Sequence, residues 1–166
     1  MVLRKIVEIS KILLNNNWKI VFVPVWINDV HYIKNAVKLI SSENVSIFSR
    51  FLSLNDTMNL IKKCDLFIAE KLHAGILSAC VYTPFIMLEY RPKCYDFMKS
   101  LDLEDLNFRT DRLCVDEIIQ KLENIYANTD IYQQQIKSKV DYYKRELLNS
   151  VPKVIERINN QNANIF

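Results

Sequence analysis

Basic and imidazole side chains gather in two short segments, 70–75 and 89–93. Each segment follows an apolar run typical of a buried strand and leads into a run with helical spacing. In an open parallel sheet, ligands bind outside the carboxyl ends of the strands, and consecutive parallel strands are usually neighbours. We therefore expect the two segments to converge on one small anion. The side chains concerned are Lys71, His73, Arg91 and Lys93.

The first segment opens a helix with small residues, among them Ala74 and Gly75. Small residues let a helix approach the sheet closely, and its N-terminus offers free N–H groups and a positive dipole end to an anion. Lys71 adds positive charge, and His73 can give or take a proton near neutral pH. A structural role fits the same residues, with Glu70 capping the helix, Lys71 solvated and His73 packed.

The second segment contains Arg91 and Lys93, which could clamp a phosphate or carboxylate. Pro92 is favoured in the first turn of a helix. The alternative here is an ordinary solvated basic loop. A third candidate, His31 beside Asp29, is better explained as part of a helix cap than as a catalytic pair.

The sequence pattern predicts that strands and helices alternate along the chain, and these elements would position the two segments. The strands are apolar without period-two alternation, which indicates a parallel sheet covered on both faces. The fold class expected is α/β, a Rossmann-like doubly wound parallel sheet of about five strands with a long C-terminal helix. Asp29 is expected to cap the second helix, and Asn55 or Asp56 the third. We expect helices over 2–15, 30–40, 56–63, 72–81, 92–101, 115–126 and from 131, and strands over 19–23, 44–48, 65–69, 84–88 and around Phe108.

Composition narrows the function. The chain has 166 residues and one glycine, so Gly-rich phosphate loops are excluded. A net charge of +3 is too mild to indicate nucleic acid as a partner. The four cysteines form no C-x-x-C pair and the chain has only two histidines, which argues against a zinc site. No apolar run is long enough to span a bilayer, and we expect a cytoplasmic protein.

The order of elements holds one anomaly. A doubly wound unit normally begins with a strand, whereas residues 2–15 predict a helix first. This helix needs a preceding strand beside which to pack. Either another chain completes the sheet, or the sequence is the C-terminal part of something longer.

Three stretches occur in the order seen in a known family. They are the strand-Pro-Asp region from Ile20 to Asp29, the run Cys64 to Ala74 with Lys71-Leu72-His73-Ala74, and the run Thr83 to Met98. Over roughly residues 5–125 the chain resembles the polysaccharide pyruvyl transferase family. That family has an Arg-Leu-His-Ala signature after an Asp-bearing strand, then a Gly-x-Pro strand and a Tyr-x-x-Lys segment.

The resemblance implies the C-terminal half of a GT-B-like enzyme that moves a pyruvyl group from phosphoenolpyruvate onto a sugar of a surface polysaccharide, as in exopolysaccharide biosynthesis. His73 falls on the signature histidine and would be the catalytic acid. Phosphoenolpyruvate is the donor substrate, a saccharide is the acceptor, and no further cofactor or metal is expected. The implied substrate-binding residues are Lys71, Leu72, Ala74, Gly75, Tyr90, Arg91 and Lys93.

Two positions depart from the family's pattern. Lys71 replaces the signature arginine and lacks its planar fork, and Tyr82-Thr83 replaces the glycine before Pro84.

Residues 1–128 would form the Rossmann-like half, and 129–166 a helical extension. Two other functions stay open: the nucleotide-sugar-binding half of a GT-B glycosyltransferase, and a non-catalytic fragment. The partner would be a second copy or a separate chain that holds the N-terminal half.

Overall fold

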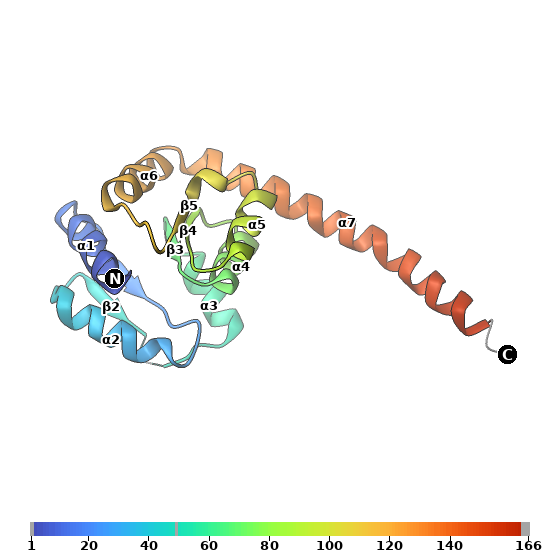
Figure 1. Ribbon diagram of the computed structural model, residues 1–166, viewed down its shortest axis with the longest axis horizontal. Coiled ribbons are helices and arrows are strands. Elements are labelled where there is room, and N and C mark those ends of the chain that lie inside the picture. The colour runs from blue at the N-terminus through green and yellow to red at the C-terminus, as the bar shows by residue number, and fades with distance from the viewer. Residues whose placement is uncertain (1, 49, 164–166) are drawn as a thin grey trace.

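The computed structural model describes residues 2–48 and 50–163, in which helices and strands alternate as the sequence predicts (Figure 1). None of the helices in this part of the chain is long and apolar enough to cross a membrane. The elements are α1 (Val2–Asn15), β1 (Ile20–Phe22), α2 (Asp29–Ile40), β2 (Val45–Ile47), α3 (Leu54–Ile61), β3 (Phe67–Ala69), α4 (Leu72–Cys80), β4 (Phe85–Glu89), α5 (Pro92–Ser100), η1 (Glu104–Leu106), β5 (Asn107–Arg109), α6 (Val115–Ala127) and α7 (Thr129–Ala163).

The five predicted strands are present, but they do not form one sheet. β1 pairs with β2, and β3, β4 and β5 form a second sheet in that order; every pair is parallel. Within the described ranges, no pairing joins β1 to β3. The prediction of a single doubly wound sheet is therefore wrong in this respect, although the α/β class and the parallel pairing are confirmed.

The helices lie on two sides of the strands, as in a doubly wound fold. α1 contacts α2 and α6, whereas α4 contacts both α3 and α5 (Figure 1). α7 packs on α4 and α6 near its start and then projects away from the body (Figure 1). It continues through Pro152 to Ala163, and its residues from Leu147 to Ile155 include five exposed apolar side chains. The predicted long C-terminal helix is confirmed.

Two predicted helix caps are wrong. The third helix is capped by Ser53, whose Oγ accepts a hydrogen bond from the Asp56 N–H at 3.1 Å. Asp29 is the first residue of α2 and follows its N-cap, Asn28. Its carboxylate bonds elsewhere, as described below.

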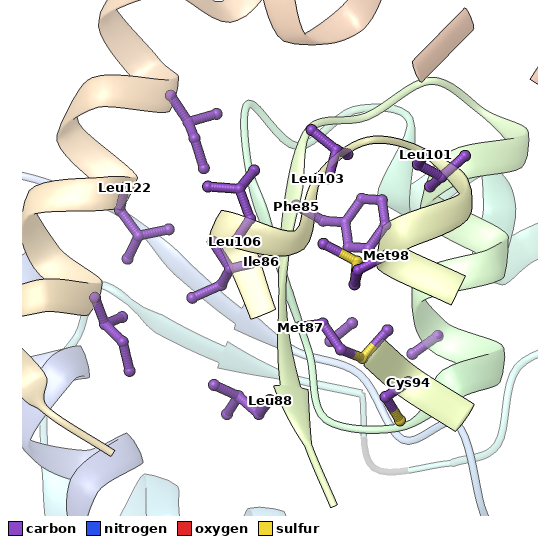
Figure 2. Packing of buried hydrophobic residues seen from close by; sticks show 14 of the residues in the cluster. Phe85, Ile86, Met87, Leu88, Cys94, Met98, Leu101, Leu103, Leu106 and Leu122 are labelled. Atoms are coloured by element: carbon purple, nitrogen blue, oxygen red, sulfur yellow. The ribbon is translucent and has the colours of Figure 1, made fainter. Parts of the chain in front are cut away.

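The core is built around β4. Residues Phe85 to Leu88 are at most 1% exposed. Their side chains alternate between the two faces of the strand, and Figure 2 shows Phe85 near Met98, with Leu122 on the side of Ile86. Strands buried on both faces require apolar residues at every position, which is why this segment lacks alternation.

Gly75 sets the distance between α4 and this strand. A Cβ at position 75 would lie 2.3 Å from Cε of Met87 and 3.2 Å from Cε2 of Phe85. Both neighbours are fully buried, so they have little room to move. The expectation that small residues bring this helix close to the sheet is confirmed.

Gly75→Ala should therefore destabilise the protein, although alanine is the better helix former. Overpacking against Met87 and Phe85 should lower the free energy of unfolding by about 1–3 kcal/mol in urea titrations. The double variant Gly75→Ala/Met87→Leu removes the clashing methyl group and should lose less than the sum of the two single losses. A Gly75→Ala protein as stable as the parent would contradict this packing.

Candidate functional site

Parallel pairing brings the two predicted segments to one edge. β3 and β4 pair with Phe67 opposite Phe85 and Ala69 opposite Met87. Each strand is followed by a short loop and a nine-residue helix, α4 or α5. The loops around Lys71 and Arg91 are thus neighbours at the carboxyl end of the sheet, where the sequence predicted a ligand.

The N-termini of α4 and α5 lie at this edge, and neither has a side-chain cap. Their N-cap residues, Lys71 and Arg91, have extended backbones and make no side-chain cap, and neither helix has an acidic residue in its first turn. The proposed cap by Glu70 is therefore not formed; this side chain is exposed. Helix N-termini with no acidic residue in the first turn favour the binding of an anion.

Lys71 is fixed by an ion pair that the sequence did not reveal. Its Nζ donates to Oδ1 of Asp29 at 2.8 Å, and Oδ2 of Asp29 accepts the N–H of Trp26 at 2.9 Å. Partial burial would lower the pKa of Lys71, but the hydrogen bond and the charges of Asp29 and Glu70 outweigh it and raise that pKa. Lys71 is thus ion-paired with a side chain that is 36% exposed, and it links the loop after β1 to the loop after β3.

The second segment supplies two positive charges, on Arg91 and Lys93. Arg91 and Lys93 are exposed, and among residues 2–48 and 50–163 neither has a carboxylate within salt-bridge distance. Nζ of Lys93 lies 5.7 Å from the ring centre of Tyr90, which is itself exposed. These cations are available to a ligand that approaches from solvent.

His73 occupies the second position of α4 and is exposed. The alternative of a packed histidine is therefore wrong. Leu72 is half-buried, whereas Ala74 and Gly75 are buried and their N–H groups donate to the Lys71 carbonyl. The last two residues position the helix, and their direct contact with a substrate stays a prediction. His31, the weaker candidate, shares a hydrogen bond with Asn35 on α2.

A further polar pair at this edge escaped the sequence analysis. Glu89, the last residue of β4, accepts a hydrogen bond from Nδ2 of Asn107, and its carbonyl accepts two from Thr110. The signal was the position of Asn107 at the start of the weak strand around Phe108, which pairs with β4. This network fixes the end of β4 and hence the loop that contains Arg91.

The pairing of Lys71 with Asp29 predicts how stability depends on pH. The folded state raises the pKa of Lys71. The ion pair therefore contributes fully to the free energy of unfolding below the ordinary lysine pKa, and this contribution is lost as pH rises through the raised pKa. Both groups are partly exposed, so the loss should be at most about 1 kcal/mol.

Urea titrations from pH 7 to 11 measure this loss as the difference in the free energy of unfolding between the parent and Asp29→Asn. The difference should shrink above pH 10. Asp105→Asn, which breaks the exposed pair with Lys121, is the matched control and should change stability by less than about 0.5 kcal/mol. A difference between parent and Asp29→Asn that stays constant over this range would contradict the assignment.

Comparison with known proteins finds a family match that includes most of the candidate site. The family model for polysaccharide pyruvyl transferase matches residues 2–92, which is more than half of the 166 residues. No curated protein and no solved structure matches the chain. The matched span covers the Lys71–Asp29 pair, His73 and Arg91 and ends one residue before Lys93. The chain belongs to the polysaccharide pyruvyl transferase family.

Proposed function

We propose that the chain binds phosphoenolpyruvate at the carboxyl ends of β3 and β4 and forms the donor site of a pyruvyl transferase. One observation supports this most. The pairing of β3 with β4 brings together two helix N-termini without side-chain caps, and the second of them carries Arg91 and Lys93, which have no ion-pair partner within the described part of the chain. Phosphoenolpyruvate has a phosphate and a carboxylate, so it needs at least two cationic groups. Lys71, already neutralised by Asp29, would orient the ligand more than attract it.

The reaction assigns a role to His73. Its imidazolium would give a proton to the methylene carbon of the enol, and C2 would become an oxocarbenium-like centre. The C2–O bond to phosphate breaks, and two sugar hydroxyls form the two C–O bonds of the ketal. One hydroxyl proton returns to the imidazole and the other leaves with phosphate. Arg91 and Lys93 would stabilise the departing phosphate.

The open site leaves room for the acceptor. His73, Tyr90, Arg91 and Lys93 all face solvent. Pyruvyl transfer works best when water is excluded from the reacting atoms. We infer that a further polypeptide covers this edge and helps to bind the saccharide, as expected if this chain is one half of a two-part enzyme.

Arg91→Met and Lys93→Met should each weaken binding of phosphoenolpyruvate about tenfold or more, because each removes a charge-assisted contact. Isothermal titration at fixed ionic strength measures the dissociation constants. Lys99→Met is the matched control, since Lys99 is an exposed lysine in the last turn of the same helix. Equal losses for Lys93→Met and Lys99→Met, or tighter binding of uridine diphosphate than of phosphoenolpyruvate, would contradict the donor assignment.

His73→Gln should separate binding from chemistry. Glutamine keeps hydrogen-bonding capacity but cannot deliver a proton at neutral pH. We expect phosphoenolpyruvate affinity to change by less than about threefold and phosphate release in the presence of acceptor to fall about 10²–10⁴-fold. Unchanged phosphate release by this variant would show that His73 is not the acid.

A further inference from the structure

An apolar cleft of about 970 Å³ separates the two sheets. Asp29, Glu70 and Lys71 lie among the residues that line it, so it reaches the edge that holds the candidate site. Most of the lining is aliphatic and comes from the two facing strands and from α1. Its representative members are Val21, Val23, Leu66, Ile68, Ile6 and Ile9.

β1 turns one unpaired edge toward this cleft. The N–H of Ile20 donates to the carbonyl of Asn44, and the carbonyl of Phe22 accepts from the N–H of Phe48. Both residues therefore bond to β2. Because successive residues of a strand direct their backbone groups to opposite edges, the N–H and C=O of Val21 point away from β2, into the cleft.

β3 presents the complementary edge. The N–H of Phe67 donates to the carbonyl of Pro84, so Phe67 bonds toward β4 and the backbone groups of Ile68 face the cleft. The ion pair between Lys71 and Asp29 joins the residues that follow β3 and β1, which shows that the two strands end on the same side. Two parallel edges with free donors and acceptors thus line one apolar space, and such edges favour the pairing of another strand.

The connection after β1 leaves the cleft side of this strand open. α2 leads from β1 to β2, and β2 pairs with the edge of β1 that faces away from the cleft. Among the described residues, no strand lies on the other edge of β1.

We infer that this cleft is a strand-binding slot: it takes an apolar strand of a partner polypeptide, parallel to β1 and β3, and so joins the two sheets into one. The strand bonds to Val21 and Ile68 on its two edges. One face contacts α1 and the other contacts Ala74, so β-branched residues without charges suit its centre. This binding mode is strand addition, with affinity from main-chain hydrogen bonds.

The probe is a synthetic peptide of alternating valine and isoleucine between lysine ends, titrated into the full chain. Val21→Pro and Ile68→Pro each remove one N–H that faces the slot without removing a bond to β2 or β4. Each should weaken peptide binding about tenfold or more. Ile47→Pro is the matched control: Ile47 lies in β2 between Ser46 and Phe48, so its N–H faces the outer edge, and affinity should stay within about twofold.

Amide hydrogen exchange on the parent chain provides a test that needs no variant. The amides of Val21 and Ile68 should exchange quickly in the free protein and become protected when the peptide binds. Protection of both amides in the free monomer would overturn the inference, because β1 would then pair with β3 directly. Equal affinity of the peptide for the parent, Val21→Pro and Ile68→Pro would overturn it too. So would a dimer of the chain that Val21→Pro dissociates, since a second copy would be the occupant.

Discussion

The pairing of β3 with β4 is the interaction on which the site depends. It holds two loops at one edge, and each loop ends in a helix N-terminus without an acidic residue. The close approach of Gly75 to Met87 and the burial of Phe85 to Leu88 in β4 support this pairing. This edge is positive because the dipoles of the two helices have their positive ends here and because Arg91 and Lys93 add their charges.

Much of this could be predicted from the sequence, since local patterns determine it. The uninterrupted apolar run from Phe85 to Leu88 indicates a strand covered on both faces, and the position of Lys71, His73 and Arg91 just after two strands places them at one edge. The family resemblance rests on the same residues and is confirmed by the match over 2–92. His73 is exposed at this edge.

Most features that the sequence did not reveal depend on long-range contacts, and the Ser53 cap is a local exception. Lys71 and Asp29 are 42 positions apart, and Asp29 looked like a helix cap because aspartate is common there. Ser53 takes the capping position expected of Asn55 or Asp56, three residues before the N–H that it accepts. The division into two sheets could not be predicted from the sequence, because an apolar strand has the same residue pattern whether or not another strand pairs with its edge.

The site and the cleft meet at Lys71, which borders both. The most direct measurement of the central claim is a backbone NMR titration of the chain with phosphoenolpyruvate. The amides of Leu72, His73 and Lys93, at the starts of α4 and α5, should shift together with one dissociation constant. Shifts confined to other basic regions, such as the exposed part of α7, would contradict it, as would separate constants for the two helices.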